Sequence, residues 1–195
     1  MTIAKAGAPI PVTLFAGPRG AGKSRTMLSL LDFKPESERW TLVVEEIGQT
    51  MPDPGLLSNR NVAVRGAPYG CPCCSGNLTM RISLARTVRE TRPHRILVEL
   101  PWGAHLERLL SLFGDPLLMQ SVSLAGLITV LDAGMSALSD MPEALRDALN
   151  CSDLILLNGV DNHPGTVSSL SHSFPGKRVV DGADRNLFMQ LLEPR

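Results

Sequence analysis

Short apolar runs alternate along the chain with segments whose apolar residues recur at helical spacing. The first run, Val12 to Ala16, is typical of a buried strand, and Ser24 to Leu31 has the apolar face of a helix. The same alternation predicts strands at 41–44, 62–64, 96–99, 127–131, 154–157 and 178–180, and helices at 79–91, 105–113, 142–149 and 187–192. Strands joined by helices pair in parallel and are covered on both faces. We therefore predict an α/β fold, a three-layer sandwich with a mainly parallel central sheet.

Polar residues and glycines stand at the ends of several predicted strands. Gly17, Glu99, Asp132 and Asn158 each follow or close an apolar run. In open parallel sheets, ligands bind beyond the carboxyl ends of the strands. We therefore expect the functional site at that edge. The glycine- and proline-rich stretch between the second and third strands predicts a mobile loop.

Composition favours one globular domain, which we place at residues 11–195 after a flexible N-terminal tail at residues 1–10. Hydrophobic residues make up 44% and charged residues 19%, which is enough apolar material for a buried core. The 19 basic and 19 acidic residues cancel, so we expect neither nucleic acid nor a membrane as a partner. The chain shows no membrane-spanning run and no secretory signal. We expect a cytoplasmic protein.

The segment from Gly17 to Ser24 has the spacing G-x-x-x-x-G-K-S of a phosphate-binding loop, or P-loop. Its glycines let backbone N–H groups point at phosphate oxygens, and the following helix presents its N-terminus to the same anion. Lys23 is placed to reach the terminal phosphates and the Ser24 hydroxyl to bind Mg²⁺. A glycine-rich turn followed by Lys-Ser by chance does not account for the flanking strand and helix. We expect these residues to hold the nucleotide: Gly17, Gly20, Ala21, Gly22, Lys23, Ser24 and Arg25.

Three of the four cysteines, Cys71, Cys73 and Cys74, lie within four positions. Such crowding is poor spacing for disulfides and good spacing for a metal, and thiolates select Zn²⁺, Cu(I) or similar ions. Three ligands are one short of a closed tetrahedral site, so an exchanging site or a fourth ligand from elsewhere is expected. His94, His105 and Cys151 are candidates for that ligand, and the sequence does not choose among them. The alternative is three packed or redox-active thiols.

Carboxylates stand near the predicted phosphate site. Glu99 closes a strand, where it is placed to hold Mg²⁺ through water or to orient an attacking water. Its alternative is an ordinary surface carboxylate. Asp53 and Glu46 are further candidates for the nucleotide region, and a turn aspartate is the alternative for Asp53.

Taken together and in this order, the motifs resemble the GTPase domain of the CobW-like metal-chaperone GTPases. These P-loop proteins form a branch that includes the nickel-insertion GTPases of hydrogenase and urease. The likeness covers residues 11 to 192, and the P-loop combined with the cysteine signature makes it specific. The segments that carry it are Gly17–Ser24, Val43–Gly48, Asp53, Gly70–Cys74, Val98–Trp102, Thr129–Ala133 and Asp153–Asp161.

The resemblance implies GTP and Mg²⁺ as cofactors and a thiophilic metal such as Zn²⁺ at Cys71, Cys73 and Cys74. It implies that nucleotide state and metal binding are coupled, and that a client metalloprotein or assembly partner receives the metal. A homodimer is one arrangement it allows. By the same resemblance, Asp161 accepts hydrogen bonds from guanine and Asn158 braces the loop. Lys23 and Glu99 take the catalytic roles, with Mg²⁺ held by Ser24 and Glu99.

The chain departs from the family pattern at several positions. Gly159 replaces the lysine whose stem packs along the base, so affinity for guanine nucleotides is expected to fall. Leu100-Pro101-Trp102 stands in place of Thr-Ser-Gly, and Gly103 follows one residue later. Glu45 replaces an asparagine and Asn77 an aspartate. The family's C-terminal domain is expected to be missing, because the chain ends near the edge of the GTPase domain.

These observations leave three hypotheses. The first is a slowly hydrolysing GTP-binding metallochaperone. The second, favoured by Gly159 and Trp102, is a degenerate nucleotide-binding module that acts as a non-hydrolysing regulator or subunit of a metalloenzyme-maturation assembly. The third is a P-loop kinase or ATPase that uses adenine nucleotides.

Overall fold

The structure is a computed structural model that describes residues 8–45, 54–67, 76–135 and 141–184. Its core is a seven-stranded sheet in the order β3-β2-β4-β1-β5-β6-β7. Every pairing between these strands is parallel. The strands are β1 (Ile10–Ala16), β2 (Trp40–Val44), β3 (Val62–Gly66), β4 (Arg95–Glu99), β5 (Val122–Asp132), β6 (Leu154–Asn158) and β7 (Arg178–Asp181). The predicted α/β fold with a parallel central sheet is confirmed.

Helices connect successive strands. The α-helices are α1 (Lys23–Leu30), α2 (Pro54–Ser58), α3 (Gly76–Thr91), α4 (Leu106–Ser111), α5 (Pro116–Met119), α6 (Glu143–Cys151) and α7 (Thr166–Ser173). Short 3₁₀ helices are η1 (Leu31–Phe33), η2 (Leu112–Gly114) and η4 (Val160–Asn162). Among the residues that the structure describes, no helix is long and apolar enough to span a bilayer.

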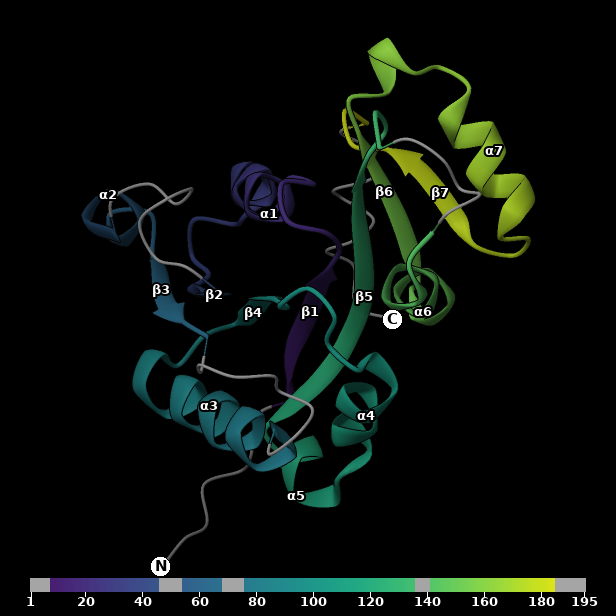
Figure 1. The fold of residues 1–195 in the computed structure, drawn as a ribbon. Coiled ribbons are helices and arrows are strands. Elements are labelled where there is room, and N and C mark those ends of the chain that lie inside the picture. The colour runs from purple at the N-terminus through teal and green to yellow at the C-terminus, as the bar shows by residue number, and fades with distance from the viewer. Residues whose placement is uncertain (1–7, 46–53, 68–75, 136–140, 185–195) are drawn as a thin grey trace, which may run out of the picture.

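The helices form two layers, one on each face of the sheet (Figure 1). Neighbouring residues of a strand point to opposite faces. Phe15 accordingly packs in one apolar cluster with Met27 of α1, and α2 joins the same cluster. The adjacent Leu14 packs in a second cluster with Leu84 of α3 and Leu109 of α4. A third cluster joins α6 and α7 to β5 and β6. Burial on both faces explains why these strands read as unbroken apolar runs.

Several elements differ from the predicted boundaries. β1 begins at Ile10, so the last residue assigned to the flexible tail is part of the sheet. β5 begins at Val122 and pairs with β1 from Val122 to Thr129, although Ser123 and Gly126 weaken its apolar signal. α2, α5 and α7 were not predicted, and α2 lies in the stretch expected to be a mobile loop. The helix predicted at 187–192 lies outside the described residues.

The carboxyl ends of the central strands meet at one edge of the sheet. Phe15 of β1 is in register with Glu99 of β4, and Asp132 of β5 with Asn158 of β6. The backbone N–H of Leu100 donates to the Phe15 carbonyl at 2.9 Å, which extends the β1–β4 contact one residue further. Glu99, Asp132 and Asn158 therefore lie at the edge where the sequence analysis predicts the functional site.

Candidate functional site

The loop between β1 and α1 packs against the neighbouring strands so closely that two of its glycines have no room for a side chain. Gly17 has a φ of 132°, and a Cβ there would lie 2.1 Å from the Val130 carbonyl oxygen. Gly22, the N-cap of α1, has a φ of 93°, and its Cβ would lie 2.6 Å from Asn158 Nδ2. Gly20 also has a left-handed φ of 78°. The glycine spacing is therefore required by backbone conformation and by close packing.

Lys23 is buried, with 5% of its surface exposed, and it closes the loop on itself. Its Nζ donates to the carbonyl oxygens of Gly17 at 3.0 Å and Pro18 at 3.1 Å. Glu99 Oε1 lies 3.8 Å from the same nitrogen. Burial lowers the pKa of the Lys23 ammonium below its usual 10.5, although Glu99 and Glu45 act in the opposite direction. The loop thus holds one desolvated cation at the position predicted for phosphate binding.

Ser24 and Glu99 come together across the first turn of α1. The Ser24 hydroxyl lies 3.2 Å from Glu99 Oε1 and 3.1 Å from Oε2 and donates to this carboxylate. The hydroxyl and the carboxylate are hard oxygen donors of the kind that Mg²⁺ prefers beside bound phosphates. Glu99 is 9% exposed, so it is not the ordinary surface carboxylate of the alternative. These residues fit a magnesium site, and the predicted pairing of Ser24 with Glu99 is supported by geometry.

Asn158, at the end of β6, braces the same loop from the other side. Its Nδ2 donates to the Ala21 carbonyl at 2.8 Å. The backbone N–H of Gly182, after β7, donates to the Leu157 carbonyl at 2.7 Å, so the loop after β7 is fixed beside Asn158. Three strand ends, β1, β6 and β7, are thereby tied into one site.

The described chain matches the family profile for the CobW/HypB/UreG nucleotide-binding domain over residues 11–174. The protein belongs to this family. It is similar to the zinc chaperone YeiR of Escherichia coli strain K12, with 31% identity over 150 residues that cover 76% of this chain and 46% of YeiR. It is also similar to the zinc chaperone CobW of a Sinorhizobium species, with 27% identity over 192 residues that cover 83% of this chain and 54% of that one. The chain thus spans about half the length of these relatives.

Solved structures agree on the fold. The Zn(II)-bound YjiA GTPase of Escherichia coli superposes with a TM-score of 0.62 at 17% sequence identity, covering 90% of this chain and 57% of YjiA. At that identity, the likeness concerns the fold alone. Membership in the CobW/HypB/UreG family and the P-loop fold, both predicted from the motifs, are confirmed.

Asp161 of this CobW/HypB/UreG domain lies in η4, three residues beyond Asn158, and its side chain is exposed. Gly159 between them has a left-handed φ of 75°. A Cβ at Gly159 would meet Asp132 Oδ1 at 3.9 Å, an ordinary van der Waals contact, so space does not exclude a side chain there. Backbone conformation favours glycine at this position over the lysine of the family pattern. Arg25, in the first turn of α1, is exposed, and Ala21 is buried under the loop.

The departure at residues 100–102 forms a defined turn. Ala104 donates its N–H to the Pro101 carbonyl at 3.3 Å, and Gly103 has a φ of 78°. Glycine at the third position of such a turn is the usual requirement of a type II turn. Trp102 is 38% exposed at the second position of the turn. The shifted glycine is therefore used to make this turn.

The metal-ligand predictions fall mostly outside the described residues. Residues 68–75, which carry Cys71, Cys73 and Cys74, and residues 46–53, which carry Glu46 and Asp53, lie there. Within the described ranges, no group of three or more His, Cys, Asp or Glu side chains is placed to hold a metal. The zinc site predicted from the cysteines stays a prediction.

The three candidates for a fourth metal ligand lie at different edges of the sheet. His94 directly precedes β4, and its Nδ1 accepts from the Arg39 backbone N–H at 2.9 Å. Cys151 ends α6 and precedes β6. Both therefore lie toward the amino edge of the sheet. His105 instead follows β4 as the N-cap of α4, beyond the carboxyl edge where the P-loop lies, and is exposed.

One pair of charged residues at the site was not singled out from the sequence. Arg19, inside the P-loop, has its Nη2 3.6 Å from Oε1 of Glu45, the residue after β2. The sequence signal was a cation within the loop itself, two residues after its first glycine. The ion pair could not be read from spacing, because it depends on how β2 and the loop meet.

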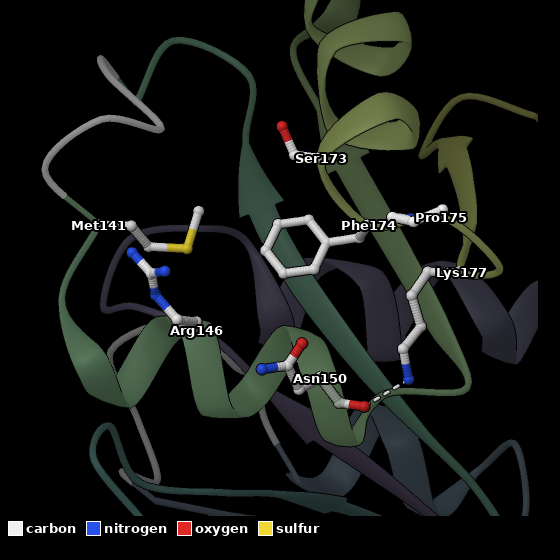
Figure 2. A pocket seen from close by; sticks show the side chains of 7 residues that line it. All are labelled: Met141, Arg146, Asn150, Ser173, Phe174, Pro175 and Lys177. Atoms are coloured by element: carbon white, nitrogen blue, oxygen red, sulfur yellow. Dashed lines mark hydrogen bonds between the residues drawn. The ribbon is translucent and has the colours of Figure 1, made fainter.

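A separate hollow of about 520 Å³ lies against α6 and the end of α7 (Figure 2). Figure 2 shows the Phe174 ring between Arg146 and Lys177. The Lys177 ammonium donates to the carbonyl oxygens of Asn150 and Ser152, the latter at 2.9 Å. It thus ties the end of α6 to the segment before β7, toward the amino edge of the sheet. We assign this hollow no part in nucleotide binding.

Proposed function

We propose that this domain binds GTP with Mg²⁺, hydrolyses it slowly, and couples its nucleotide state to a Zn²⁺-type metal held by Cys71, Cys73 and Cys74. The observation that supports this most is the convergence of Lys23, Ser24 and Glu99 at the P-loop. Family membership supports the nucleotide, and two relatives with the name zinc chaperone support the metal. We further propose a cytoplasmic setting with a client metalloprotein or assembly partner.

The phosphates of GTP would be held by the loop from Gly17 to Ser24, with Arg25 and the buried Ala21 flanking the contact. Lys23 now donates to two loop carbonyls, so it would exchange these for the terminal phosphates. The ammonium is already desolvated, which strengthens its attraction for an anion. Ser24 and Glu99 would hold Mg²⁺, which neutralises charge on the phosphate oxygens when bound.

The base would lie against Asn158 and Asp161. A paired carboxylate selects guanine, because adenine would leave the polar groups of the site unpaired. Gly159 offers no side chain to cover the base, so affinity should be lower than a lysine would give. The carboxylate of Asp161 supports GTP over ATP and weakens the third hypothesis, an enzyme that uses adenine nucleotides.

Hydrolysis would proceed by in-line attack of water on the γ-phosphorus. Glu99, which lies close to Lys23 and Ser24, would orient that water. We expect a slow intrinsic rate. The turn at Pro101–Ala104 presents Trp102 where the family pattern has a glycine.

The cysteine segment is joined directly to the nucleotide edge by the chain. It follows β3, whose carboxyl end lies at the same edge as the P-loop, and precedes α3. Metal bound there would bias the segments around it, and GTP would bias metal affinity by an equal factor in return. Physical adjacency along the chain supports this coupling.

A second candidate is a module that binds GTP without hydrolysing it and regulates a metalloenzyme-maturation assembly. Trp102 in the turn and the left-handed Gly159 favour it. Turnover of GTP distinguishes this candidate from the first.

The experiment measures multiple-turnover GTP hydrolysis and competition between GTP and ATP for the wild type and Lys23→Ala. We expect a slow GTPase activity that Lys23→Ala abolishes, and preference for GTP. Binding of GTP without any turnover would select the regulator, and preference for ATP would refute both.

A further inference from the structure

Arg19 carries a positive charge inside the P-loop, between two of its glycines. Its side chain is 74% exposed, and its Nη2 lies 3.6 Å from Glu45 Oε1. Glu45 follows β2 directly, so it stands at the carboxyl edge where the loop lies. An ion pair as exposed as this one contributes little to stability, because solvent screens it. The pair can therefore separate at small cost.

The pair lies close enough to Lys23 to act on its ammonium. Burial lowers the pKa of Lys23, and the positive charge of Arg19 lowers it further. The carboxylates of Glu99 and Glu45 act in the opposite direction. Two cations and two carboxylates thus lie close together at the P-loop. Lys23 pairs with Glu99 on the buried side, and Arg19 pairs with Glu45 on the exposed side.

We propose that Arg19 is a phosphate-contacting residue which this chain supplies to its own nucleotide, and that Glu45 holds its guanidinium until a triphosphate binds. This inference rests on the proposed binding of GTP at the P-loop. Guanidinium groups bind phosphate through two parallel charge-assisted hydrogen bonds, so a bound triphosphate would compete with Glu45 for Arg19. Because Arg19 belongs to the loop proposed to bind the phosphates, its side chain extends from beside them.

The contact bears on the hydrolytic step as well. Water forms a bond to the γ-phosphorus while the bond from that phosphorus to the β–γ bridging oxygen breaks. The electron pair leaves with GDP, and the water proton is released with inorganic phosphate. Negative charge shifts toward the bridging oxygen and the γ-oxygens during this step, and a guanidinium beside them stabilises it. An arginine in the same chain makes this contribution without a partner protein.

The test compares affinities for GTPγS and GDP, with Mg²⁺, for the wild type and four variants by calorimetry. Arg19→Ala should weaken GTPγS binding by about tenfold or more, as loss of a charge-assisted hydrogen bond implies, and change GDP binding by about twofold or less. The affinity of Arg19→Lys for GTPγS should lie between those of the wild type and Arg19→Ala, since lysine keeps the charge and loses the two parallel hydrogen bonds. Glu45→Gln should strengthen GTPγS binding, because it removes a carboxylate charge that competes with phosphate for Arg19. The matched control is Arg89→Ala, an exposed arginine in the last turn of α3.

Equal losses for GTPγS and GDP in Arg19→Ala, or no loss, would overturn the proposal. Failure of the wild type to bind GTPγS at all would instead refute the proposed function. Where the wild type hydrolyses GTP, Arg19→Ala should lower kcat by about tenfold or more. The single-turnover rate should not depend on protein concentration. A rate that rises with concentration would place the arginine in a second copy and contradict its action within one chain.

Discussion

Asn158 Nδ2 donates to the carbonyl oxygen of Ala21 at 2.8 Å, and 137 residues of chain separate the two. The contact joins the strand end proposed to bind the base to the loop proposed to bind the phosphates. A Cβ at Gly22 would lie 2.6 Å from the same amide nitrogen, so the two segments are in direct contact. The end of β6 and the P-loop are therefore parts of one packed unit.

Asn158→Ala should weaken GTP binding by about fivefold or more, because the Ala21 carbonyl loses its donor and the loop its brace. The free energy of unfolding should fall by about 1–3 kcal/mol for the same reason. Calorimetry with GTPγS and urea unfolding measure the two effects. Asn150→Ala, an exposed asparagine on α6, is the control and should change neither. Unchanged affinity in Asn158→Ala would show that the hydrogen bond does not support the site.

Gly22→Ala should destabilise the fold by about 1–3 kcal/mol and abolish nucleotide binding, because the residue combines a φ of 93° with a steric clash. Gly114→Ala is the matched control, since no heavy atom lies within 4 Å of its Cβ position. We expect the control to change stability by about 0.5 kcal/mol or less. Thermal unfolding and GTPγS binding provide the readouts. Equal behaviour of the two variants would contradict the packing described for the loop.

The pH dependence of GTPγS binding should report the ionisation of Lys23. Burial holds the pKa of Lys23 below 10.5, and phosphate prefers the protonated form. Affinity should therefore be full below that pKa and fall as pH rises through it. Glu99→Gln removes a charge that raises this pKa, so the fall should begin at a lower pH. Glu107→Gln, an exposed carboxylate on α4, should leave the profile unchanged.

Coincident pH profiles for wild type and Glu99→Gln would mean that Glu99 does not act on Lys23. Profiles are best measured in the presence and absence of Mg²⁺. Glu99→Gln should also weaken the gain in affinity that Mg²⁺ gives, because it removes an oxygen ligand of full charge.

Gly159→Lys tests whether the missing side chain limits affinity for guanine. The lysine stem should raise GDP affinity. A side chain on the left-handed backbone at this position should lower the free energy of unfolding by about 1–2 kcal/mol. Gly159→Ala shares the backbone cost and lacks the stem, so it should lower stability and leave affinity unchanged. If both variants bind GDP alike, the lysine of the family pattern contributes nothing here.

Much of the fold was predictable because every described strand contains a short apolar run. All seven described strands contain the segments predicted for them. The short helix α5 was missed, although Asp115 caps it and Pro116 begins it, because four residues show no periodicity. α2 was missed because its proline and glycine suggested a loop.

The site was predictable where the chemistry is local. The P-loop required a fixed glycine and Lys-Ser spacing, and Glu99 was identified from its place at a strand end. His94 and Cys151 lie two and three residues before predicted strands, so their amino-edge position follows once those strands are known to be parallel. The pairing of Arg19 with Glu45 could not be predicted, because it depends on how the end of β2 and the P-loop are placed in the fold.

One calorimetric cycle measures whether metal and nucleotide binding are coupled. Zn²⁺ affinity is measured with and without GTPγS and Mg²⁺, and GTPγS affinity with and without Zn²⁺. We predict that each ligand changes the affinity of the other by the same factor, about fivefold or more. Combined Cys71→Ser, Cys73→Ser and Cys74→Ser should abolish the effect, and Cys151→Ser should preserve it. Zinc affinity that is independent of GTPγS, or that survives loss of the three cysteines, would rule out coupling through this cysteine site.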